Sequence, residues 1–281
     1  MAVGRLAPID RLTLVYLGVA SAALAWNWHQ PVPLRGLLVL AHLLLVAVVL
    51  AAPAARAAAP GGSLVAEAYP LLLAGAIYTE IGVLNSAAGV SYDPLIQAWD
   101  QALFGLQPAR DWIRAQPWPW LSWPLHLGYL GYYAILAGAP LGLWWSGRRD
   151  GARRTLLLMM AAFFLCYSTF LVFPVAGPYY FFPRADNPAK SIAAARLVHR
   201  LLDGGAAWGT AFPSSHVAAS WAAAVSAWWA WRGLGLVLML ASLLLTLGTV
   251  YGGFHYGVDT LTGALVAIAV LGIGRVTMGS R

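Results

Sequence analysis

The chain has 281 residues, of which 60% are hydrophobic and only 10% are charged. Soluble domains usually carry about 25% charged residues, so the polar material is too sparse to coat a water-soluble globule, and the composition indicates a membrane protein. The net charge of +7 comes without a basic cluster interleaved with aromatics, which excludes a nucleic-acid partner. The single cysteine, Cys166, excludes an internal disulfide framework and a multi-cysteine metal site.

Eight stretches approach or reach the roughly 20 apolar residues that a bilayer-spanning helix needs. Two lie within residues 1–60, and six lie within a membrane domain over residues 61–281. An all-α integral membrane protein of about eight transmembrane helices is therefore expected. The predicted spans run from Leu12 to Trp28, Leu34 to Ala52, Leu64 to Leu84, Leu121 to Trp145, Thr155 to Phe173, Ser215 to Trp231, Leu234 to Phe254 and Tyr256 to Ile273.

Two connecting segments are too long to be simple turns. In residues 85–120, Leu95, Trp99, Leu103 and Leu106 recur at helical spacing, which predicts an amphipathic helix in the membrane interface. Residues 174–213 form a long loop rich in aromatic and cationic side chains. Long loops on a rigid scaffold are typical of functional sites.

The arginines orient the chain in the membrane. Residues 147–154 hold Arg148, Arg149, Arg153 and Arg154, and the positive-inside rule places this loop in the cytoplasm. Alternation of the spans then puts both termini in the cytoplasm. Segments 85–120 and 174–213 are expected on the outer (periplasmic, extracellular or lumenal) face.

The third predicted span contains two acidic residues, Glu67 and Glu80. A charged side chain inside the bilayer is energetically costly. Glu80 is the nearer to the outer surface, where it either helps to select an acceptor hydroxyl or makes a structural helix contact. His42 and His126 have no acid near them in sequence and are interpreted as packing or interfacial residues.

The first chemical motif is Ala211-Phe212-Pro213-Ser214-Ser215-His216, directly before the sixth span. Pro followed by Ser predicts a helix start with Ser214 as N-cap, so free backbone N–H groups would attract an anion. His216 falls in the first turn, within reach of that anion. The alternative is a capped helix that carries an interfacial histidine.

The second motif runs from Tyr251 to Asp259, between the last two spans. His255 and Asp259 are four residues apart, so on a helix they share a face, and the carboxylate can hold one ring nitrogen while the other points away. This is the arrangement of a nucleophile with its orienting group. The alternative is a buried structural pair.

Alternating spans bring His216 and His255 to the same depth on the outer face. With cations from the 174–213 loop, they would form a phosphate pocket in which one imidazole attacks phosphorus and the other protonates the leaving oxygen. Phosphoryl transfer through a phosphohistidine follows, with no metal and no cofactor expected. The loop cations are Arg184, Lys190, Arg196 and Arg200.

Pro-Ser-Ser-His and His-Tyr-Gly-Val-Asp, about one helical hairpin apart, resemble the second and third motifs of the type 2 phosphatidic acid phosphatase superfamily. The resemblance covers roughly residues 64–273 and implies a six-helix core. It further implies that His255 is the nucleophile, Asp259 its orienting partner and His216 the general acid. The expected substrate contacts are Ser214 as a phosphate ligand, with Ser215, Arg184, Tyr179 and Lys190.

This sequence also departs from the phosphatase pattern. Thr249 stands where the phosphatases carry an Arg six residues before the nucleophile, and the first motif, Lys with six residues to Arg-Pro, is missing. A phosphodiester carries one charge and needs fewer cations than a phosphomonoester, so a diester donor is favoured. Segments 92–105, 129–133 and 249–256 look like the inositol phosphorylceramide synthase branch, which moves a headgroup phosphate from a phospholipid onto a lipid alcohol.

Three functions remain open. A transferase would pass a headgroup phosphate through His255 to a lipid alcohol. A hydrolase would pass it to water, with a lipid phosphate or polyprenyl pyrophosphate as substrate. A carrier or scaffold would bind a lipid headgroup without turnover. The expected partners are thus a phospholipid donor, a lipid alcohol or water as acceptor, and membrane lipids, with the oligomeric state left open.

Overall fold

The computed structural model describes residues 5–59 and 63–278, and within them the regular structure is helical, with one isolated bridge between Val175 and Thr210. Six of the described helical segments are long and apolar enough to cross a membrane. They are α1 (Pro8–Trp26, continued by the short helix η1 to His29), α2 (Arg35–Ala57), α3 (Leu64–Ala88), α8 (Arg149–Val172), α12 (Arg232–Tyr251) and α13 (Gly257–Met278).

The other two expected spans differ from the prediction. Residues 121–145 do not form one helix, because the chain is divided at Gly131 into α6 (Pro119–Leu130) and α7 (Tyr132–Trp145). The sixth expected span is α11 (Ser215–Ala230), which has only 16 residues. This helix lies inside the bundle, where it packs against α7, α8, α12 and α13. Its buried face is alanine-rich, and small side chains let helix backbones approach closely.

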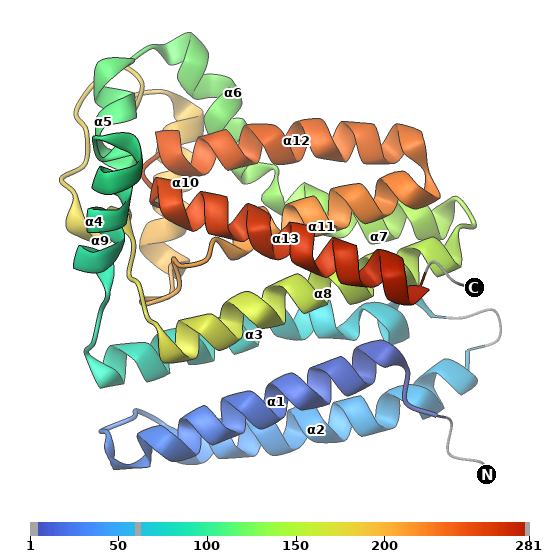
Figure 1. Ribbon diagram of the computed structural model, residues 1–281. Helices are drawn as coiled ribbons and strands as arrows, with labels where there is room; N and C mark the ends of the chain where they lie inside the picture. Colours follow the sequence, from blue (N-terminus) through green and yellow to red (C-terminus); the bar gives the residue numbers. More distant parts are fainter. Residues whose placement is uncertain (1–4, 60–62, 279–281) are drawn as a thin grey trace.

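Four short helices gather at one end of the bundle (Figure 1): α4 (Asp93–Phe104), α5 (Pro108–Ala115), α9 (Pro178–Phe181) and α10 (Ala193–Gly205). The amphipathic helix expected in residues 85–120 is present as two helices. Gly105 adopts a left-handed φ of 72° and ends α4. Pro108 then occupies the first position of α5, where a missing N–H costs nothing.

An ionic cluster joins helix ends at the opposite side of the bundle. Arg56, near the end of α2, contacts Asp10 in the first turn of α1 at 2.6 Å and Glu67 in the first turn of α3 at 3.3 Å. Arg153, near the start of α8, contacts Glu67 at 2.9 Å. Glu67 therefore lies at the end of a spanning helix between two arginines, so its charge is compensated.

Glu80, in the second half of α3, makes a separate interhelical contact. Its carboxylate lies 2.8 Å from Nε2 of His42 on α2, and Nδ1 of His42 lies 2.9 Å from the hydroxyl of Ser21 on α1. No acid lies near His42 in sequence, and its acidic partner comes from another helix. The contact joins α1, α2 and α3 through groups that would be costly if they were unpaired.

Candidate active site

His255 lies in the five-residue connection between α12 and α13. The carbonyl of Thr249 accepts hydrogen bonds from the backbone N–H groups of Phe254 and His255, at 2.9 and 3.0 Å, which folds the chain back over the end of α12. Asp100 of α4 accepts the N–H groups of Gly257 and Val258 at 3.0 and 2.8 Å. These amides are the free donors at the start of α13, so a carboxylate from a distant helix caps it.

The hydrogen bonds of the His255 ring set its tautomer. Nδ1 lies 3.0 Å from the carbonyl of Ala211 and 3.5 Å from Oδ2 of Asp259. Because a carbonyl can only accept, Nδ1 carries the hydrogen and Nε2 carries the free lone pair. Burial lowers the pKa of His255 to about 4, so its imidazole is neutral at physiological pH.

The two residues of the third motif do not share a helical face as expected. His255 precedes α13, whereas Asp259 is the third residue of that helix. Oδ2 of Asp259 accepts the N–H of Tyr256 at 2.9 Å, which is the backward bond of a helix cap. Oδ1 of Asp259 is buried and has no hydrogen-bond partner among the described residues. Asp259 therefore holds the start of α13 while it faces the His255 ring.

His216 is the second residue of α11. Ser214 is the N-cap of this helix, and its hydroxyl accepts the N–H of Val217 at 3.4 Å. The N–H of Ser214 donates to the carbonyl of Asp259 at 2.9 Å, which ties the start of α11 to α13. The close approach requires Gly263, because a Cβ there would lie 2.5 Å from the carbonyl oxygen of Ser214.

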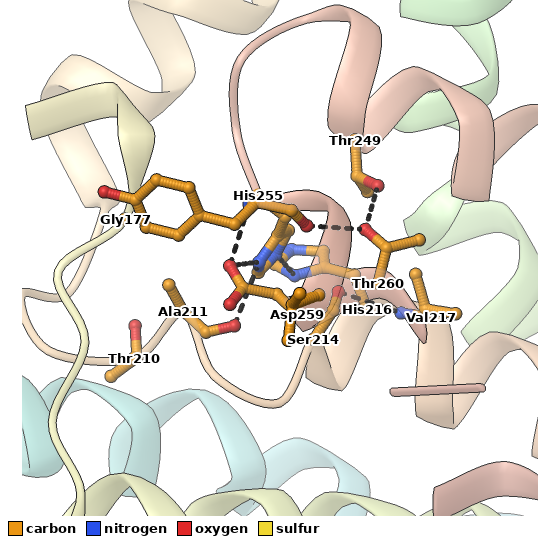
Figure 2. Close-up of polar contacts among 12 residues, drawn as sticks. Gly177, Thr210, Ala211, Ser214, His216, Val217, Thr249, His255, Asp259 and Thr260 are labelled. Atoms are coloured by element: carbon orange, nitrogen blue, oxygen red, sulfur yellow. Dashed lines mark hydrogen bonds and ion pairs between the residues drawn. The ribbon is translucent and has the colours of Figure 1, made fainter. Parts of the chain in front are cut away.

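The two histidine rings are in direct contact. Nδ1 of His216 lies 3.4 Å from Nε2 of His255, and Figure 2 shows the rings side by side with Ala211 and Asp259 next to His255. Tyr129 and Tyr132 pack against the His216 ring, with centroid distances of 5.4 and 4.3 Å. The free lone pair of His255 is therefore directed toward a second imidazole that aromatic rings hold in place.

Both imidazoles line a cavity of about 600 Å³. Ser215 lines the cavity next to the two histidines. None of the described lining residues is a lysine or arginine. Leu72 of α3 and Tyr133 of α7 are 70% and 67% exposed, so the cavity reaches the lateral surface of the bundle. The remaining walls are mainly aliphatic and aromatic, and include Leu71, Gly75, Tyr78, Tyr129, Tyr132, Leu136, Phe163, Tyr167, Tyr179, Val198, Leu201 and Leu202.

Only some of the residues expected to contact the substrate line this cavity. Ser215 and Tyr179 line the cavity, whereas Ser214 is buried in the helix cap. Arg184 does not line it and instead lies 2.5 Å from Asp203. Lys190 also lies elsewhere, with its ammonium 2.7 Å from the carbonyl of Gly252.

The expectation of one pocket shared by the loop cations and the two histidines was therefore wrong. The reason is α10, whose apolar face lines the histidine cavity while Arg196, His199 and Arg200 line a separate cavity together with Arg184 and Lys190.

The two fully buried aspartates of α4 are positioning residues that the motif analysis missed. Asp93 accepts the N–H groups of Ala176 and Gly177, both at 2.7 Å, and the hydroxyl of Tyr256 at 2.9 Å. Asp100, seven residues later, holds the start of α13. Positions seven apart lie on one helix face. Two acids that share a face with Ile96, apart from the exposed Leu95 and Trp99, were therefore the available signal.

The fold and the site together define a multi-pass helical membrane protein with a paired-histidine pocket. The chain belongs to the PAP2 superfamily, whose family model matches residues 95–273. This membership indicates a lipid phosphatase or phosphotransferase.

One similar protein is a PA-phosphatase related-family protein of Dictyostelium discoideum, 29% identical over 118 residues, which cover 40% of this chain. The match spans 21% of that relative, about a fifth of its length. No solved structure matches this chain.

Proposed function

We propose that this protein is a lipid phosphotransferase that moves a headgroup phosphate from a phospholipid onto a lipid alcohol through a phosphohistidine on His255. The observation that carries the proposal is the contact between the His216 and His255 rings at the wall of an apolar cavity. A nucleophile with an oriented tautomer and an adjacent proton carrier are the two groups that such a transfer needs. The assignment to the inositol phosphorylceramide synthase-like branch is part of this proposal.

In the first step, Nε2 of His255 attacks the donor phosphorus. An N–P bond forms, the P–O bond to the diacylglycerol oxygen breaks, and His216, which starts as imidazolium, gives a proton to that oxygen and becomes neutral. In the second step, His216 takes the proton of the acceptor hydroxyl, whose oxygen attacks phosphorus and releases His255. The Ala211 carbonyl and the Asp259 carboxylate stabilise the positive charge that His255 carries between the steps.

The geometry also requires a movement of His216. At 3.4 Å the two ring nitrogens are in contact, so no phosphate fits on the line between them. The substrate must approach Nε2 from the cavity and displace the His216 ring toward the leaving oxygen. Tyr129 and Tyr132, which pack on that ring, would guide the displacement.

The chemistry of the cavity favours a diester donor and a lipid acceptor. Its described lining residues include no lysine or arginine, and a phosphodiester carries one negative charge where a phosphomonoester carries up to two. The walls are mostly apolar and open at Leu72 and Tyr133 toward the lateral surface. A long-chain alcohol therefore enters from the bilayer more readily than water.

We further propose that this pocket lies at the outer face and that both termini are cytoplasmic. Arg153, in the arginine-rich segment 147–154, lies near the start of α8 in the ionic cluster. This cluster is at the end of the bundle opposite the junction of α12 and α13, where His255 lies (Figure 1). The positive-inside rule assigns that end to the cytoplasm.

The second candidate function is hydrolysis of a lipid phosphate. The relative from Dictyostelium favours it, because its name refers to PA-phosphatase. His255 and His216 would keep their roles in the first step, and water would replace the lipid alcohol in the second.

The test uses purified protein in vesicles with a phosphate-labelled phospholipid and an added lipid alcohol. Label on the alcohol supports the transferase, and free labelled phosphate supports the phosphatase. Protein without turnover in either assay, in a preparation that binds the labelled lipid, would identify a carrier. His255→Ala serves as the inactive control, which removes any contribution from a contaminating enzyme.

A further inference from the structure

A second cavity of about 350 Å³, here called the basic groove, lies on the other side of α10 from the histidine cavity. α10 lies between the two cavities and lines each of them with a different face. Val198, Leu201 and Leu202 line the histidine cavity, and residues 196, 199, 200 and 203, spaced at helical intervals, line the groove. The groove is lined by Arg184, Ala185, Lys190, Arg196, His199, Arg200 and Asp203.

The charges of the groove are unbalanced. Its one carboxylate, Asp203, is occupied by Arg184 at 2.5 Å and by the hydroxyl of Tyr179. Within the described chain, no carboxylate lies at ion-pair distance from the three remaining cations, Lys190, Arg196 and Arg200. Like charges gathered around one cavity repel one another, so an anion in the groove would stabilise the arrangement.

Lys190 and His199 supply an independent indication of an absent acceptor. Nζ of Lys190 lies 2.7 Å from Nε2 of His199 and 2.7 Å from the carbonyl of Gly252. Because an ammonium only donates, Nε2 accepts and Nδ1 of His199 must carry the hydrogen. This buried Nδ1 has no hydrogen-bond partner among the described residues.

The charge on Lys190 also depends on a counter-ion. Burial, with the nearby Arg184 and Arg114, lowers the pKa of Lys190 to about 7. A bound anion would favour the ammonium form of Lys190. The anion would then be the counter-ion that the groove cations lack.

We propose that the basic groove binds the phosphate of an anionic lipid headgroup, at a site separate from the His216–His255 pocket. The lipid source is favoured over a free anion because Leu197 and Leu201 of α10 are 44% and 51% exposed beside the groove arginines. Exposed leucines next to arginines are typical of a helix that lies in a membrane interface, where the leucines enter the acyl region and the arginines meet phosphates.

An occupied groove would also stabilise the nucleophile loop. Lys190 holds the carbonyl of Gly252, three residues before His255. A headgroup that keeps Lys190 charged and in place therefore fixes the start of the connection that carries His255. The groove thus joins lipid binding at the surface to the position of the catalytic ring.

The test titrates phosphatidylglycerol into detergent-purified His255→Ala protein and follows the rise in Tm, so that binding is measured without turnover. Phosphatidylcholine, which has no net charge, is the reference lipid. The double variant Arg196→Gln/Arg200→Gln removes two exposed groove cations, and Arg232→Gln/Arg275→Gln removes two exposed arginines from the far ends of α12 and α13.

We expect phosphatidylglycerol to raise Tm more than phosphatidylcholine does. The groove variant should require at least about tenfold more phosphatidylglycerol for the same shift, and the control variant should match the parent. Equal shifts in the groove variant and the parent would overturn the site. A full shift with inorganic phosphate alone would overturn the assignment to a lipid. Neither outcome depends on whether the proposed phosphoryl transfer is correct.

Discussion

Nε2 of His255 lies 3.4 Å from Nδ1 of His216, although 39 residues separate them in the chain. The hairpin of α11 and α12 produces this contact, because α11 begins at the site and α12 returns to it. Each ring is held from behind by a different element: His255 by the Ala211 carbonyl and His216 by Tyr132.

Replacement of His255 by alanine should abolish turnover with the fold intact. The variant lacks the proposed nucleophile, so product formation should fall by at least about a thousandfold. The measurement is label transfer from phospholipid in vesicles, with Tm as the check on folding. His29→Ala, at an exposed histidine outside the cavity, is the matched control and should keep full activity. A fully active His255→Ala protein would rule out both enzymatic functions.

Replacement of His216 by alanine should slow the reaction by a factor that depends on the leaving group of the substrate. A poor leaving group such as an alkoxide needs a proton, so its reaction should slow by roughly 10²–10⁴-fold. A p-nitrophenyl phosphodiester, whose leaving group is stable as an anion, should slow much less. Single-turnover rates on both substrates give the comparison. The same loss on both would mean that His216 positions His255 and does not transfer a proton.

Asp100→Asn should lower kcat while leaving KM nearly unchanged. Its carboxylate accepts two backbone N–H groups at the start of α13, and an amide oxygen without the charge holds them less well. Misplacement of the nearby His255 should cost about tenfold to a hundredfold in kcat, with a loss of about 1–3 kcal/mol in stability. Asp150→Asn, at a 98% exposed side chain, is the control. An unchanged kcat in a destabilised Asp100→Asn protein would show a purely structural role.

Activity should have an acid limb set by His255. Burial holds its pKa at about 4, against 6.5 for a free histidine, so the nucleophile stays neutral until the pH falls to about 4. Below that pH, kcat/KM should decrease about tenfold per pH unit. The unfolded chain binds this proton from pH 6.5 downward and the folded chain only from about pH 4, so the protein loses stability as the pH falls from 6.5 to 4.

The rate must therefore be measured on protein that remains folded at each pH. An acid limb near pH 6.5 in folded protein would contradict a buried neutral His255.

Much of the fold follows from hydropathy alone, because long apolar runs have few alternatives to spanning helices. The same pattern cannot show that α11 is a short helix at the centre of the bundle, since a central helix and a lipid-facing helix are both apolar all round. The division of residues 121–145 at Gly131 was likewise hidden, because α6 and α7 form one continuous hydrophobic stretch in the sequence.

The approach of His216 to His255 was predictable, since alternating spans return to the same membrane face. The contacts that position each ring were not, because they come from residues far apart in sequence: Asp100 caps α13 across 158 positions at Val258. The cations Arg184 and Lys190 were misassigned because their chemistry suits phosphate in either cavity, and only the placement of α10 decides which one they line.

Gly75→Leu should change which acceptor chains the enzyme accepts. Gly75 lines the histidine cavity from α3, and a Cβ there would meet no atom within 4 Å, so leucine fills cavity space without a clash. A long-chain alcohol would then lose room for its acyl part, and its transfer rate should fall about tenfold relative to a short-chain alcohol. The fold should not suffer, because leucine is a better helix former than glycine by roughly 0.5–1 kcal/mol. Gly138→Leu on α7 is the matched control, since Gly138 also faces open space but does not line the cavity. A Gly75→Leu enzyme that retains the parent's preference for chain length would show that the acceptor chain does not occupy this cavity.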